Sequence, residues 1–69
     1  MIILNEVKQF RKERKLTQEA LAKKIGVSRK TINSLEKGNY TPSLLLAFQI
    51  ARVLGVDITE VFTLEEAKS

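Results

Sequence analysis

With 69 residues the chain has room for one domain (1–69), and the lack of cysteine and histidine excludes disulfide bonds and Cys/His zinc sites. No segment approaches the ~20 consecutive apolar residues of a membrane span, so we expect a soluble cytoplasmic protein. The formal net charge is +4, with nine Lys and Arg against three Glu in residues 1–30, and three basic against five acidic residues in 31–69. This asymmetry either attracts a polyanion to one side of the molecule or only solvates the surface.

Helical spacing of apolar residues predicts five helices, over about 5–15, 17–25, 28–37, 42–54 and 58–62. Each of the three glycines follows a helical pattern, which is typical of the residue just past a helix end: Gly26, Gly38 and Gly55. Four residues precede helices as expected N-caps: Thr17, Ser28, Thr41 and Asp57. Pro42 would then take the first helical position, and Glu60 would complete a capping box with Asp57.

The apolar positions of these helices are assigned to one core: Val7, Phe10, Leu21, Ala22, Ile25, Ile32, Leu35, Leu46, Ala47, Ile50, Ala51 and Leu54. Leu16 and Val27 lie in connections and should complete this core. The two ends carry short β-branched and aromatic runs, at 2–3 and 61–64. These runs either extend the first and last helices or pair as two antiparallel strands, and we expect the small sheet.

Two short helices follow one another between Thr17 and Gly38, joined by the segment Ile25-Gly26-Val27-Ser28. A short glycine-containing turn between buried aliphatic residues lets one helix cross another steeply. The second helix then stands clear of the body and fits a major groove about 12 Å wide. A helical hairpin would instead bury both helices against each other.

The segment 16–56 resembles the Cro/phage-repressor (Xre-type) helix-turn-helix family, and the similarity extends from about Val7 to Phe62. Its marks are specific only in combination: Thr17-Gln18, Leu21-Ala22, Gly26-Val27-Ser28, Ile32, Leu35-Glu36, Gly38 and Pro42-Ser43. The resemblance implies an all-α, lambda-repressor-like five-helix bundle with its helix-turn-helix motif at about 17–36. The start MIILNEV and the tail after Phe62 are similar to the small cytolysin-repressor-like regulators, which implies a rigid dimer and a short terminal sheet.

The resemblance also implies roles for particular residues. Base-contacting positions are Arg29, Lys30, Asn33 and Ser34, with Thr31 beside them. Phosphate-contacting positions are Gln18, Ser28, Lys37, Asn39 and Tyr40. Arg11 and Glu36 match a structural salt bridge. The alternatives are a solvated charged face for the polar positions, N-capping for Ser28, and a cover over the core edge for Tyr40.

Leu44, Leu45 and Phe48 give the fourth helix more apolar residues than one buried face requires. Such an excess indicates either a partner surface or an ordinary core with one exposed leucine. We expect a homodimer interface made of Leu45, Ile58, Val61, Phe62 and Leu64.

These features predict a sequence-specific regulator of transcription that binds double-stranded DNA, a repressor on an inverted-repeat (pseudo-palindromic) operator. No catalytic residue, cofactor or metal is expected, because a small bundle without Cys or His has little room for an enzyme site. An antitoxin with autoregulatory DNA binding is the alternative, although only residues 63–69 remain to neutralise a toxin. A controller protein of a restriction system is another. A partner protein, or a shift in the dimer equilibrium, would carry the regulating signal.

Overall fold

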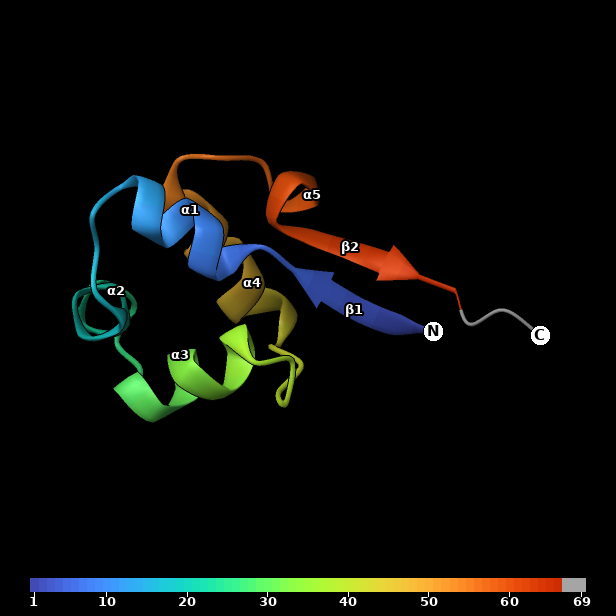
Figure 1. Cartoon of the computed structure of the whole chain (residues 1–69), viewed down its shortest axis with the longest axis horizontal. Coiled ribbons are helices and arrows are strands. Elements are labelled where there is room, and N and C mark those ends of the chain that lie inside the picture. Colours follow the sequence, from blue (N-terminus) through green and yellow to red (C-terminus); the bar gives the residue numbers. More distant parts are fainter. Residues whose placement is uncertain (67–69) are drawn as a thin grey trace.

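The computed structural model describes residues 1–66, in the order β1 (Ile2–Asn5), α1 (Val7–Glu13), α2 (Gln18–Ile25), α3 (Arg29–Glu36), α4 (Leu44–Leu54), α5 (Ile58–Val61) and β2 (Phe62–Glu65). The five helices form a bundle, and the two strands project from one end of it (Figure 1). The predicted all-α bundle with a small terminal sheet is therefore confirmed.

The two helices of the helix-turn-helix motif, α2 and α3, each begin after a capping residue, and α2 is followed by a glycine. The Thr17 hydroxyl accepts a hydrogen bond from Ala20 N at 3.0 Å, and Ser28 Oγ accepts one from Thr31 N at 3.1 Å. Each cap satisfies a backbone donor that the first helical turn leaves without a partner. Helix α2 ends at Gly26, whose φ of 93° lies in the left-handed region that glycine adopts without steric cost.

Two expected helix boundaries are wrong. Helix α4 begins at Leu44 rather than at Pro42, because Ser43 caps it by accepting a hydrogen bond from Leu46 N at 3.1 Å. Thr41 and Pro42 therefore belong to the preceding loop. Helix α1 covers only Val7–Glu13, because Asn5 is paired in β1 and the chain turns at Lys15, which has a φ of 57°.

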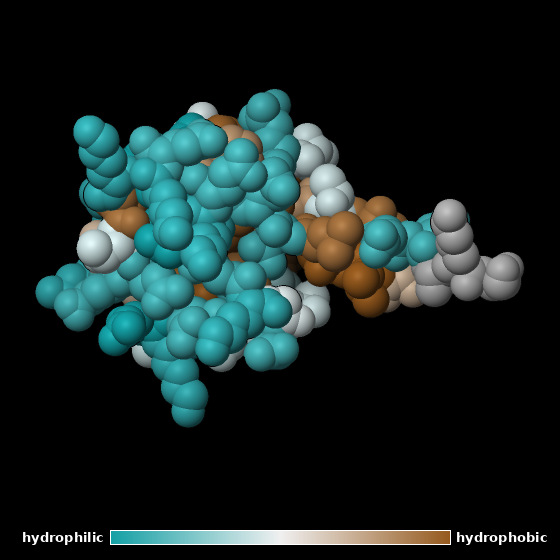
Figure 2. Space-filling model, viewed as in Figure 1, coloured by the Kyte–Doolittle hydropathy of each residue, from teal (hydrophilic) through white to brown (hydrophobic). Residues whose placement is uncertain are grey.

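The terminal strands pair antiparallel, with Ile3 opposite Leu64 and Asn5 opposite Phe62. Side chains alternate between the two faces of a sheet, so these four residues share one face. Ile2, Leu4, Thr63 and Glu65 share the other. Figure 2 shows apolar side chains gathered over this sheet, whereas polar side chains cover the visible face of the helical body.

The core lies between the helices and contains seven fully buried large side chains: Val7, Leu21, Ile32, Leu35, Ile50, Leu54 and Val61. Phe10, Ile25 and Val27 are half-buried and pack against it. Leu16 is half-buried in the turn after α1, outside the set of residues that pack against this core. Val61 is 0% exposed within the chain, so its expected place in a dimer interface is wrong. Its side chain belongs to the core, and Ile58, one helical turn earlier in α5, packs against that core while remaining half-buried. Within residues 1–66, no helix is long and apolar enough to cross a membrane.

Candidate nucleic-acid interface

Helix α3 packs chiefly against α2 and presents a polar face to solvent. Ile32 and Leu35 point inward and are 0% exposed. Arg29 and Lys30 are exposed, while Asn33 and Ser34 are half-buried beside them. Because a helix repeats every 3.6 residues, the buried pair and the polar set occupy opposite sides of α3.

Three shallow hollows run side by side along this polar face. The first, of about 330 Å³, is lined by Ser28, Lys30, Thr31, Ser34, Asn39 and Tyr40. The second is lined by Arg11, Thr17, Gln18, Glu19 and Arg29, and the third by Arg29, Lys30 and Asn33. Arg29 and Lys30 each line two hollows, which makes the surface continuous. It joins the beginning of α2, the outer face of α3 and the loop after α3.

This surface gathers nearly all the residues to which base or phosphate contacts were assigned. Lys37, the residue directly after α3, is exposed but lines none of the three hollows. The beginning of α2 lies in the second hollow, and a helix N-terminus attracts anions through its backbone N–H groups and its dipole. The beginning of α2 therefore offers backbone donors to a phosphate beside α3.

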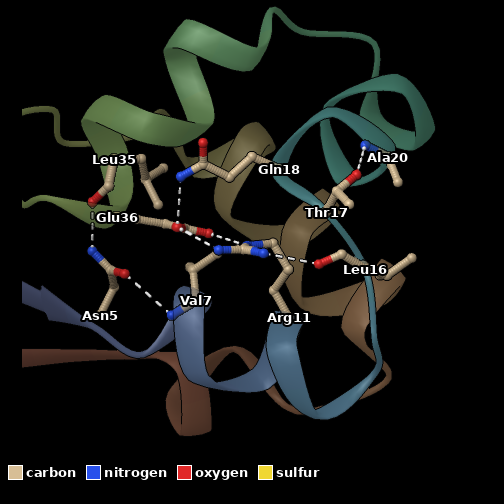
Figure 3. A network of polar contacts seen from close by, with 9 residues as sticks. All are labelled: Asn5, Val7, Arg11, Leu16, Thr17, Gln18, Ala20, Leu35 and Glu36. Atoms are coloured by element: carbon tan, nitrogen blue, oxygen red, sulfur yellow. Dashed lines mark hydrogen bonds and ion pairs between the residues drawn. The ribbon is translucent and has the colours of Figure 1, made fainter.

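The end of α3 is fastened to the body by a buried ion pair (Figure 3). Arg11 Nε donates to Glu36 Oε2 at 2.6 Å and Arg11 Nη2 to Glu36 Oε1 at 3.1 Å. The side chains are only 9% and 3% exposed. Arg11 Nη1 also donates to Leu16 O at 2.8 Å. This bidentate pair ties helix α1 and the turn after it to the last residue of α3.

Gln18 joins the same network, because its Nε2 donates to Glu36 Oε1 at 3.0 Å. One amide hydrogen and the backbone N–H of Gln18 remain for another partner, so its phosphate contact stays a prediction. The interaction with Glu36 was not foreseen from the sequence. It joins the first residue of α2 to the last residue of α3.

Asn5 is a second residue that sequence reasoning missed. Its Nδ2 donates to Leu35 O at 2.9 Å, and its Oδ1 accepts from Val7 N at 3.1 Å. The contact with α3 spans 30 residues of chain and ends on a backbone carbonyl. The only signal in the sequence was that an asparagine precedes the first helix, where its side chain can accept a backbone N–H.

Two short helices that cross at a glycine turn, with a polar outer face on the second, define a DNA-binding helix-turn-helix protein of the class that regulates transcription. The model of the helix-turn-helix (HTH_3) family matches residues 7–61, and the chain belongs to this family.

Several relatives agree with this assignment. An uncharacterized HTH-type transcriptional regulator of Methanocaldococcus jannaschii is 55% identical over 62 residues, which cover 90% of this chain and 94% of that protein. The immunity repressor protein of Bacillus phage phi105 is 38% identical over 88% of this chain, which matches 42% of the repressor. The crystal structure of SinR, the master regulator for biofilm formation, in complex with DNA is 32% identical, with a TM-score of 0.71 over 75% of this chain and 84% of SinR.

Proposed function

We propose that this protein is a transcriptional repressor that recognises an inverted-repeat operator by placing α3 in the major groove. The observation that carries the proposal is the continuous polar surface around α3, from which Arg29 and Lys30 extend into solvent. Arg and Lys match the two acceptors of guanine, and Asn33 matches adenine. The likeness to a phage immunity repressor and to a regulator crystallised with DNA supports this role.

Phosphate contacts position the protein without selecting a sequence. Gln18 and the beginning of α2 lie on one side of α3, and Ser28, Lys37, Asn39 and Tyr40 lie at its start and in the loop after it. Nine of the twelve basic residues lie in the first 30 positions, so the positive field is strongest on the half of the chain that contains α1 and α2. The phosphate-contacting residues, together with this positive field, would fix the orientation of α3 in the major groove of cytoplasmic DNA.

The repressor acts as a homodimer in this proposal, because one short helix contacts too few base pairs to select an operator. An apolar face is available for the partner copy. Ile3, Pro42, Leu44, Ala47, Ile58 and Phe62 line an apolar hollow of about 320 Å³. Leu64 lies opposite Ile3 on the same side of the sheet and is 59% exposed. Leu45 of α4 is 70% exposed but does not line this hollow, to which α4 contributes Leu44 and Ala47. Covering this face removes apolar surface from water.

The first experiment selects bound duplexes from random DNA and measures their affinity by fluorescence anisotropy. We expect an inverted repeat with half-sites about one helical turn apart. Recovery of no preferred sequence would contradict the proposed function.

The second experiment tests the dimer with two matched variants. Leu64→Glu places a charge in the apolar face, while Thr63→Glu adds the same charge on the opposite side of the same strand. Sedimentation at micromolar concentration should show a dimer for the native protein and for Thr63→Glu, but a monomer for Leu64→Glu. If the Leu64→Glu variant remained a dimer, this face could not be the dimer interface.

A further inference from the structure

Asn5 is the one side chain within residues 1–66 that hydrogen-bonds both to the start of α1 and to the end of α3. It is half-buried and stands at the last position of β1, opposite Phe62 of β2. The next residue, Glu6, donates its backbone N–H to Val61 O at 2.9 Å. The sheet, α1, α5 and α3 therefore meet within two residues of the chain. Figure 3 shows the two hydrogen bonds of Asn5, to Val7 and to Leu35.

The two hydrogen bonds of Asn5 fix the orientation of its amide. Val7 N is a donor and must face the amide oxygen, whereas Leu35 O is an acceptor and must face the amide nitrogen. Turning the amide over would place donor against donor and acceptor against acceptor. Only an uncharged side chain with one acceptor and one donor at this separation satisfies both partners.

We propose that Asn5 is a positioning residue for DNA recognition, which sets the place of the recognition helix α3 relative to the terminal sheet. This inference rests on the proposed function, because α3 must contact bases for its position to matter. Asn5 also shares its side of the sheet with Ile3, Phe62 and Leu64 of the apolar face. In a dimer joined through that face, Asn5 connects the partner contact to the end of α3 and so helps to set the distance between the two recognition helices.

The geometry of α3 makes its position sensitive to this contact. Eight residues of helix are about 12 Å long, so a 1 Å shift at the end tilts the helix by about 5°. The side chains of a binding site must be held within about 0.5 Å of the geometry in which they contact their ligand. Leu35, whose carbonyl Asn5 holds, is adjacent to Ser34 and two residues from Asn33. A displacement at this end therefore moves two of the predicted base contacts.

The test uses Asn5→Asp, which keeps the acceptor for Val7 N and loses the donor to Leu35 O. The matched control is Gln9→Glu, which adds the same charge at an exposed position of α1 and gives up only the long, exposed hydrogen bond that Gln9 Nε2 donates to Glu13 Oε2 at 3.5 Å. The probes are the palindromic duplex selected by the native protein, versions of it with one base pair inserted or removed at the centre, and a random duplex. Affinities are measured by anisotropy at a temperature where circular dichroism shows each variant fully folded.

For Asn5→Asp we expect the ratio of selected to random affinity to fall by about three- to tenfold, because binding to the selected duplex must then hold α3 in place without the help of one hydrogen bond. The preference for the original spacing should weaken as well. Gln9→Glu should lower the affinity for all duplexes equally and leave both preferences unchanged. A ratio and a spacing preference that match those of Gln9→Glu would overturn the inference and make Asn5 purely structural.

If Asn5→Asp does not fold, Asn5→Ser serves as the second variant. Its hydroxyl retains a polar group near Val7 N, but the side chain is too short to reach Leu35 O. We therefore expect the same fall in the ratio of selected to random affinity and the same weaker preference for the original spacing. Unchanged selectivity would again overturn the inference. Absence of any selected sequence for the native protein would instead refute the proposed function, which keeps the two failures distinct.

Discussion

Removing the Glu36 carboxylate is expected to be the most damaging single change to the fold outside the apolar core. Arg11 would keep only its contact to Leu16 O, while Nε and Nη2 would lose their acceptors inside the protein. An unpaired charge at such a buried site costs about 3–5 kcal/mol. At about 0.05–0.15 kcal/mol per residue, a chain of 69 residues has roughly 3–10 kcal/mol of stability in total. Glu36→Ala should therefore leave a large fraction of the protein unfolded.

Glu36→Gln gives a measurable intermediate. The amide oxygen still accepts one hydrogen bond from Arg11, but the charge is lost, so we expect a loss of about 1.5–3 kcal/mol. Urea unfolding followed by circular dichroism at 25 °C measures it. With a slope of about 1 kcal/mol/M, the midpoint should fall by about 1.5–3 M.

The double variant Arg11→Met with Glu36→Leu completes a thermodynamic cycle. Replacing a buried pair by apolar groups of similar volume is often nearly neutral, so the double variant should be more stable than Arg11→Met or Glu36→Leu alone. A loss below about 0.5 kcal/mol for Glu36→Gln, together with additive effects of the two single changes, would refute the claim that this pair fixes the end of α3.

Arg29→Ala should cost about 1–3 kcal/mol of specific binding and relax preference at one position of each half-site, measured by repeating the selection; an unchanged consensus would exclude a base contact. Gln18→Ala should weaken binding to operator and to random DNA by about three- to tenfold in anisotropy titrations, with a further loss on the operator because Glu36 at the end of α3 loses a hydrogen bond; unchanged binding to random DNA would contradict a phosphate role. Lys15→Gly should raise stability by about 1 kcal/mol, because Lys15 holds a left-handed φ of 57°, and an unchanged urea midpoint would show no strain there.

Much of the helical body could be predicted because its signals are local and periodic. Ile32 and Leu35 had the spacing of one helix face, and both are fully buried. Ser28 precedes α3 with a short side chain that can reach a free amide, and it caps the helix. The boundaries that failed had competing local options. Thr41 and Ser43 are both good caps, and the turn at Lys15 carries no glycine to mark it.

The unforeseen parts of the site depend on contacts between distant segments. The sequence pattern contains no trace of the hydrogen bond from Asn5 to Leu35 O, because any residue offers a carbonyl. Gln18 could be placed at the beginning of α2, but its contact with Glu36 needs the crossing angle between α2 and α3. The assignment of Val61 to a partner surface failed for a similar reason, since four residues of helix were too few to define a buried side.

The structure separates the residues that hold α3 from those that would select DNA. Ser28 caps its beginning, and Glu36 and the Leu35 carbonyl anchor its end to α1, α2 and the sheet. Within residues 1–66, no side-chain hydrogen bond to the body involves the four outward side chains: Arg29, Lys30, Asn33 and Ser34. Substitutions at surface positions of this kind usually change the free energy of unfolding by no more than about 0.5 kcal/mol. Changes at these four positions should therefore alter which operator is bound while α3 keeps its place, because its anchors lie at its two ends and on the opposite side.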